Sequence, residues 1–264
     1  MRSFLSLFFL VAFASSAYPQ SSFELNYSLK FDGIDDRVMV PFNPSFPTEV
    51  FTVTTWVRTP GALRRKAIVA RGEDSITGNA AWSLYMDVDG TFKLRIEDIN
   101  DADYSYASGS FIADDNWHHL AATRNLAGAV ALYVDGQLKA SFNSTGVPSS
   151  ANNQYLTFGC THGTFGPPSP SNPVKPLWFF PGRIDEPSMW NVALSAIQVQ
   201  DLFSSGVDPT SLGLVGLWQM NKGKGQFIKD DSPAGNDGFR GGLPGRDSSD
   251  PKWKKEMPDA ATPS

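Results

Sequence analysis

The sequence has little cysteine, little glutamate and no extended block of basic residues. Cys160 is the only cysteine among 264 residues, so an internal disulfide is excluded. A chain of this size can build a large enough core without one. Two interpretations of Cys160 stay open, a buried inert thiol or a link to another chain. A net charge of −5 without a Lys/Arg block argues against nucleic acid or an anionic membrane as partner.

Long apolar runs are also scarce. The one clear run, Phe4–Phe13, is interrupted only by Ser6 and is too short to span a bilayer. Arg2 precedes it and the small residues 15–17 follow it, which is the layout of a secretory signal. We therefore expect residues 1–17 to be a signal peptide and the product to be secreted, without membrane insertion.

Helical patterns are nearly absent, and alternation with a period of two dominates instead. The segments Val50–Arg58 and Thr91–Glu97 place apolar residues on one face, which is typical of antiparallel sheets. The pairs Asp89-Gly90 and Asp135-Gly136 predict type I′ hairpin turns between such segments. Ser195 predicts the start of one short helix. A dozen or so short strands predict an all-β fold of two stacked antiparallel sheets.

Five motifs follow one another in register along the chain. They are Leu29–Val40, Phe51–Arg58, Trp117–Thr123, Leu132–Gln137 and Gly182–Leu194. Together they resemble the laminin-G-like jelly roll of the concanavalin A-like lectin/glucanase superfamily, over roughly residues 28–203. The resemblance implies a two-sheet antiparallel jelly-roll sandwich, usually secreted and often calcium-binding, in which members commonly act as sugar-binding or adhesive modules.

Two departures from the family pattern affect the expected domain. Pro187 follows the Ile-Asp-Glu motif, so its strand should be bulged or lie at an edge. Residues 213–242 resemble a stretch that often precedes the first strand in this family, so the C-terminal part should return beside residues 28–31. The alternative, the start of a second module, leaves too few residues for another sandwich. We expect one domain over 18–246 and a flexible tail over 247–264.

The motifs of catalysis and zinc binding are weak. No Glu-x-Asp-x-Glu motif occurs, and the adjacent Asp185 and Glu186 should point to opposite faces of a strand. His118 and His119 are also neighbours, so they cannot share one zinc ion. A non-catalytic protein is therefore favoured over an enzyme whose acids lie outside known motifs.

Calcium is the cofactor that the sequence favours. Aspartates outnumber glutamates, 21 to 6, which suits either tight turns or calcium ligands on loops. Asp32 ends a strand in Phe-Asp-Gly, and the resemblance places Asp185 near a structural calcium. Asp231 would approach the same end if the C-terminal strand docks. We expect these three residues to hold a structural ion; the alternative gives them turn, capping and solvated roles.

Sugar recognition needs an aromatic surface for the apolar side of a pyranose and polar groups for its hydroxyls. Two long segments, 98–109 and 161–176, are interpreted as loops that supply both. Trp178 is also a candidate for the core, because Phe179 and Phe180 follow it. The expected ligand-binding residues are Tyr104, Tyr106, Asp101, Asp103, Phe165 and Trp178.

These observations predict a secreted, non-catalytic carbohydrate-binding module whose partner is a glycan or a glycosylated extracellular surface. The alternatives are a glycoside hydrolase or other polysaccharide-active enzyme on the same scaffold, and an extracellular protein-adhesion module. Asn26 and Asn143 begin sequons that would carry N-linked glycan if the source cell glycosylates them.

Overall fold

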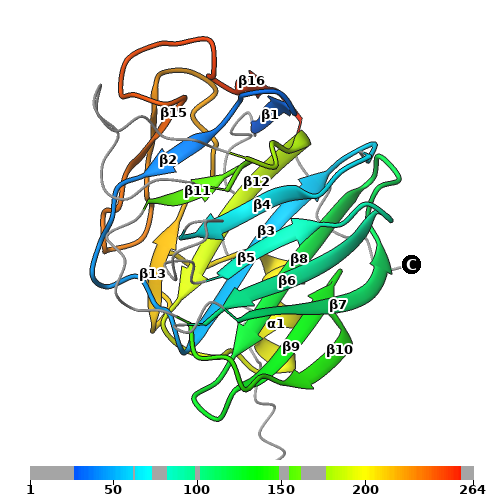
Figure 1. The fold of residues 1–264 in the computed structure, drawn as a ribbon. Coiled ribbons are helices and arrows are strands. Elements are labelled where there is room, and N and C mark those ends of the chain that lie inside the picture. The colour runs from blue at the N-terminus through cyan, green and yellow to red at the C-terminus, as the bar shows by residue number, and fades with distance from the viewer. Residues whose placement is uncertain are drawn as a thin grey trace, which may run out of the picture.

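The computed structural model describes residues 27–61, 63–72, 82–98, 102–148, 155–161 and 177–256. These residues form two antiparallel sheets of eight strands each, stacked face to face with one helix outside them (Figure 1). The predicted all-β sandwich with one short helix is confirmed. The expected signal peptide, as well as Asp101 and Phe165, lies outside the described residues.

The first sheet, which we call sheet A, contains the longest strand. Alternate residues of β3 (Phe51–Arg58), namely Phe51, Val53 and Val57, face the core, whereas Thr52, Thr54 and Trp56 face the other side, as the period of two predicts. In spatial order the sheet consists of β10 (Gln137–Asn143), β9 (Ala129–Val134), β8 (Trp117–Arg124), β3 (Phe51–Arg58), β12 (Pro181–Trp190), β1 (Ser28–Asp32) and β16 (Lys252–Lys254), and β13 (Leu214–Leu217) also pairs with β12.

The second sheet, sheet B, packs on sheet A and includes much of a segment that the sequence analysis interpreted as a loop. Residues 103–111 form its edge strand, so that interpretation of 98–109 is corrected. In spatial order sheet B consists of β14 (Phe227–Ile228), β15 (Gly238–Arg240), β2 (Val38–Val40), β11 (Leu156–Phe158), β4 (Lys66–Arg71), β5 (Trp82–Met86), β6 (Thr91–Glu97) and β7 (Asp103–Phe111).

The core fills the space between the two sheets. Phe51 of sheet A stacks on Trp82 of sheet B with ring centroids 5.1 Å apart. Each large apolar side chain buried in this way contributes about 1.5–3 kcal/mol. Cys160 is fully buried, and burial raises the pKa of its thiol to about 12. The structure therefore supports the buried, unreactive interpretation of Cys160.

The two predicted hairpin turns differ. Asp135 and Gly136 both have positive φ, 53° and 72°, as a type I′ turn requires. At the other hairpin Gly90 has positive φ but Asp89 does not. There the backbone N–H of Asp87 donates to the carbonyl oxygen of Thr91 at 3.0 Å, so the turn is longer than the predicted type I′ turn.

The helix α1 (Ala196–Ser205) begins where Ser195 predicted it. Ser195 and Gln198 form a capping box, which satisfies free N–H groups of the first turn. The helix buries Val199 in a cluster with Trp190 on the outer face of sheet A. Ile197 of the same helix is apolar but 75% exposed. Among the described residues, no helix has the length and apolar character needed to cross a membrane.

The bulge expected at Pro187 is present. The register of β12 against β3 shifts between Asp185 and Ser188, and Glu186 adopts a φ of 46°. A proline is tolerated here because the bulge removes it from the ladder of hydrogen bonds. The strand β12 nevertheless lies inside the sheet, between β3 and β1, and not at an edge.

The C-terminal part returns beside β1, but through different residues from those expected. The strand β16 pairs with β1, whereas 214–217 pairs with β12 and 238–240 pairs with β2. The tail expected from residue 247 is therefore corrected, since the sandwich continues to Glu256. The carboxylate of Glu256 contacts both Arg58 and Arg183, which anchors this segment on sheet A.

Candidate ligand-binding face

The two tyrosines of β7 point toward the core side of the strand. Tyr106 is 9% exposed, and its ring lies 5.1 Å from that of Phe142. Tyr104 is two residues away and faces the same side, where its partly buried ring packs against Gly146. The expected ligand contact of Tyr106 is corrected, because its side chain is buried; that of Tyr104 stays a prediction. Asp103 points to the opposite, exposed side.

Trp178 lies on the outside of sheet B and is only partly buried. Its ring is 5.8 Å from that of Tyr85, and the guanidinium carbons of Arg65 and Arg95 lie 5.7 and 5.8 Å from its centroid. Its φ of 55° is unusual for a bulky residue, and outliers of this kind gather at functional sites. Its carbonyl oxygen accepts the Ala67 N–H at 2.8 Å. Several contacts therefore fix an aromatic ring at the surface.

This ring forms one wall of a pocket of about 520 Å³, which we call the Trp178 pocket. Its lining combines three cations with apolar side chains. Two of the apolar residues, Val88 and Leu177, are 61% and 46% exposed. The lining residues are Arg64, Arg65, Lys66, Val88, Leu177, Trp178 and Phe179.

Asp87 forms ion pairs beside the pocket. It pairs with Arg65 at 3.3 Å and with Lys93 at 2.5 Å. Burial opposes the charge of Asp87, but the hydrogen bonds from Lys93 and the Val88 N–H, together with the charges of Lys93 and Arg65, outweigh this and hold its pKa below the ordinary value. The hydrogen bond between Lys93 and Asp87 also raises the pKa of Lys93. Arg65 is therefore oriented by a carboxylate that stays ionised at neutral pH.

The second guanidinium beside the Trp178 ring is that of Arg95. It pairs with Glu97 at 2.9 Å and with Asp103 at 2.8 Å, and these two acids face each other across β6 and β7. Glycosidases also use a pair of carboxylates that face each other. Here the guanidinium lies between them, so this arrangement orients Arg95 under the tryptophan.

The three aspartates predicted as calcium ligands lie at different points along the length of β12, one on the strand and two beside it. Asp32 pairs with Pro181, four residues before Asp185 on the same strand, and four residues span roughly 13 Å. Asp231 hydrogen-bonds through its backbone to Leu217, which pairs with Ser188 further along. The structure therefore does not bring this trio together. Asp185 is buried, and burial followed by the nearby Glu186 raises its pKa well above the ordinary value.

Asp32 instead approaches Asp35 and Asp36, in the turn between β1 and β2. One carboxylate oxygen from each lies within 4.8 Å of the others. Asp32 Oδ1 accepts the Ile34 N–H at 2.8 Å, and Asp36 Oδ2 accepts the Asp32 N–H at 2.8 Å. Burial and the neighbouring Asp32 raise the pKa of Asp36 to about 6. Oxygen ligands at this spacing suit calcium, and a cation would relieve the repulsion among them.

The neighbouring histidines point to opposite sides of β8, as predicted. His118 bonds to Asp135 at 2.9 Å and to Asp114 at 3.2 Å, and the hydrogen bond to Asp135 is the main cause of its raised pKa. His119 is buried between Trp56 and Phe203, and burial lowers its pKa to about 4. The hydrogen bonds of His118 and the packing of His119 are those of structural residues.

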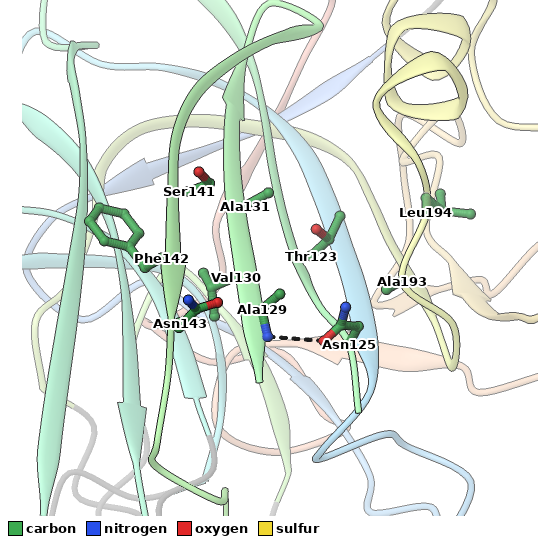
Figure 2. Close-up of a pocket in the computed structure, with 10 residues that line it drawn as sticks. All are labelled: Thr123, Asn125, Ala129, Val130, Ala131, Ser141, Phe142, Asn143, Ala193 and Leu194. Atoms are coloured by element: carbon green, nitrogen blue, oxygen red, sulfur yellow. Dashed lines mark hydrogen bonds between the residues drawn. The ribbon is translucent and has the colours of Figure 1, made fainter. Parts of the chain in front are cut away.

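A second pocket, of about 550 Å³, lies on the outer face of sheet A (Figure 2). Thr123, Ala131 and Ser141 are cross-strand neighbours on its floor, and Ala193 and Leu194 approach from the segment before α1. Asn143, the described sequon residue, is exposed at its edge. The side chains of this pocket are uncharged and mostly small, and its aromatic lining residue, Phe142, packs against Tyr106 of the core.

The cations that line the Trp178 pocket were not predicted from the sequence. Arg64, Arg65 and Lys66 are consecutive, which is the signal that could have indicated them. The run is short, and only the fold shows that it meets Trp178, more than 100 residues later. Of the predicted ligand residues, Trp178 lines this pocket and Asp103 lies on the same face, bonded to Arg95.

Comparison with known proteins gives the family. A family model described as the concanavalin A-like lectin/glucanases superfamily matches residues 32–200. No curated protein sequence matches the chain. Among solved structures it is similar to a Bacteroides ovatus ATCC 8483 protein provisionally described as carbohydrate-binding, with a TM-score of 0.63 and 18% identity over 88% of this chain and 60% of that one.

The chain is also similar to a heptameric SAP-like pentraxin from Limulus polyphemus, with a TM-score of 0.52 and 15% identity over 84% of this chain and 97% of that one. The chain spans 60% of the Bacteroides protein's length. These likenesses agree on the two-sheet architecture. Since the family model covers more than half of the sequence, the chain belongs to the concanavalin A-like lectin/glucanase superfamily.

Proposed function

We propose that this protein is a non-catalytic, lectin-like module that binds carbohydrate at the Trp178 pocket. The observation that carries the proposal is the partly exposed ring of Trp178, held at positive φ against Tyr85, with two guanidinium carbons 5.7 and 5.8 Å from its centroid. A ring fixed in this way presents a flat apolar surface at little further cost in conformational entropy.

The chemistry of the pocket fits a sugar ring. The apolar face of a pyranose packs on an indole, and the donors of Arg64, Arg65 and Lys66 can bond to its hydroxyl groups. The volume of about 520 Å³ lies within the range of small-ligand sites. The provisional description of the Bacteroides protein supports the same class of ligand.

The test compares two tryptophans with similar surroundings. Trp178→Ala should lower glycan affinity at least tenfold, measured by glycan array and then by calorimetry. Trp253→Ala is the matched control, because Trp253 is also partly exposed and packs under a guanidinium, that of Arg240 at 5.7 Å. Equal affinity of both variants and wild type would show that Trp178 is not the contact. Release of reducing ends from a polysaccharide panel would indicate the enzyme alternative.

The proposed partner is a glycan or glycosylated surface outside the cell, on the basis of the leader-like residues 1–17. Detection of the processed protein in culture medium supports this, and retention of the full chain in cells contradicts it. A protein-adhesion module is the alternative partner class. Binding that survives enzymatic removal of glycans from the target surface would favour that alternative.

We also propose a structural calcium ion, held by Asp32, Asp35 and Asp36. The support is their mutual approach and the raised pKa of Asp36, which both indicate uncompensated negative charge. This set replaces the trio expected from the sequence, of which it keeps Asp32. The ion would join the end of β1 to the start of β2, and thereby the two sheets.

A further inference from the structure

The Trp178 pocket has a charge that differs from that of the whole protein. Three cations line it, in a chain whose net charge is −5. Arg65 is paired with Asp87, but among the described residues neither Arg64 nor Lys66 forms an ion pair or a side-chain hydrogen bond. Two cations without partners therefore adjoin a fixed aromatic ring.

The surroundings of Lys66 oppose its charge. Burial, followed by repulsion from Arg64, lowers the pKa of Lys66. A side chain in this position gains more from an anion than a freely hydrated surface lysine does, because part of the desolvation has already occurred. The geometry of the pocket and the charge of its lining therefore both favour an anionic ligand.

We infer that the Trp178 pocket binds an acidic sugar, with the pyranose ring against Trp178 and its carboxylate or sulfate ester bonded to Arg64 and Lys66. This inference rests on the proposed carbohydrate-binding function and names its ligand class. Carboxylates and sulfates share the chemistry that guanidinium groups recognise, namely several acceptor oxygens in a fixed plane or tripod.

The pocket suits a sugar acid better than the other anions. A free inorganic anion would make no use of Trp178, Val88 or Leu177, which form the apolar part of the lining. An acidic peptide could reach the cations, but its carboxylates are carried on flexible chains that lose entropy on binding. A sugar acid brings a rigid ring and its charge together.

The experiment uses the full chain and matched sets of oligosaccharides. Each neutral galactose, glucose or mannose trisaccharide is arrayed beside its uronic acid and its sulfated counterpart, with triglutamate as the peptide probe. The affinities of the bound members are then measured by calorimetry at 50 and 300 mM salt. The variant Arg64→Gln/Lys66→Gln is compared with Lys222→Gln/Lys224→Gln, which removes two exposed cations far from the pocket lining.

We expect wild type and the control variant to prefer an acidic member of at least one set by tenfold or more, less so at 300 mM salt. Arg64→Gln/Lys66→Gln should lose this preference, so that it binds the acidic and the neutral members equally. The arm that binds distinguishes carboxylate from sulfate. Melting curves check folding, and the single variant Arg64→Gln, at an exposed position, repeats the test if the double variant is unstable.

Three results would overturn the inference: no acidic preference in wild type, a preference that persists in Arg64→Gln/Lys66→Gln, or triglutamate binding as tightly as the best acidic sugar. The last result would assign the pocket to an acidic peptide. If wild type binds neutral sugars alone, the inference fails while the proposed function stands. If it binds no glycan of any set, both fail.

Discussion

The outer faces of the two sheets have similar strands but different surroundings. On sheet A, Trp56 and His119 lie under Phe203 of α1 and are nearly inaccessible, 7% and 2% exposed. On sheet B, Trp178 lies over ion pairs and remains partly exposed beside a charged pocket. The helix converts one outer face into a second small core. The opposite face keeps its polar residues in reach of a ligand.

The largest expected effect comes from equivalent truncations on the two faces. Trp190→Ala removes a 1% exposed ring beneath α1 and should lower the free energy of unfolding by about 3–5 kcal/mol. Trp178→Ala should lower it by only about 1 kcal/mol, since ring contacts at a surface are weak. Urea denaturation measures both. Equal losses would contradict the distinction between a closed and an open face.

The next effect concerns pH and the buried His119. Its pKa of about 4 lies below the ordinary value near 6.5, so its contribution to stability is present above pH 6.5 and is lost as pH falls toward 4. The loss is on the order of 3 kcal/mol. Denaturation midpoints at several pH values should show a smaller slope in His119→Gln than in wild type.

His118 gives the opposite sign and serves as the control. Its raised pKa means that its contribution is present below pH 6.5 and is lost as pH rises through the folded-state pKa. His118→Gln should therefore steepen the loss of stability toward acid pH. The same slope change in both variants would show that their surroundings do not differ as described.

A smaller effect is expected at the start of the helix that closes sheet A. Ser195→Ala removes the capping box and should cost about 1 kcal/mol of stability. Ser205→Ala, at the exposed end of the same helix, should change little. Chemical denaturation measures both. If Ser195→Ala leaves stability unchanged, α1 owes its position to packing alone.

The smallest effect tests calcium at the turn that joins the two sheets. Adding 1 mM calcium after EDTA treatment should stabilise the protein by about 1 kcal/mol, or about 2–4 °C in melting temperature. Because Asp36 has a raised pKa of about 6, ionising it costs stability as pH rises from its ordinary value of 3.8 through 6. Calcium offsets that cost, so its effect should be larger at pH 7.5 than at pH 5.

Asp36→Asn should abolish the response to calcium. Asp231→Asn should keep it, since Asp231 pairs with Lys229 elsewhere. An unchanged melting temperature after EDTA treatment at pH 7.5 would refute the calcium proposal.

The fold was predictable because alternation is a local signal. In β3 and β6 each apolar residue two positions apart reaches the same side, whatever the rest of the chain does. The same signal was available for Tyr104 and Tyr106, but the acidic residues before them favoured a loop. Their inward side chains follow once the segment is recognised as the edge strand β7.

The candidate site was less predictable because it depends on contacts between distant segments. Trp178 was identified as an aromatic candidate, but the cations that line its pocket lie far away in sequence, at and just before the first residue of β4. Asp185 shows the reverse problem. Its motif suggested a metal ligand, whereas the register of β12 separates it from Asp32. Sequence patterns determine which way a side chain points more readily than which other side chains it meets.

The strand β16 has a consequence for association between molecules. Without β16, the N–H and C=O groups of β1 would form an open sheet edge, to which another polypeptide could add a strand. With β16 in place, the sheet edge consists of three residues. Two of them are Lys252 and Lys254, whose charges repel a second copy of the chain. Cutting the chain before residue 252 should therefore increase strand-mediated aggregation relative to the full chain.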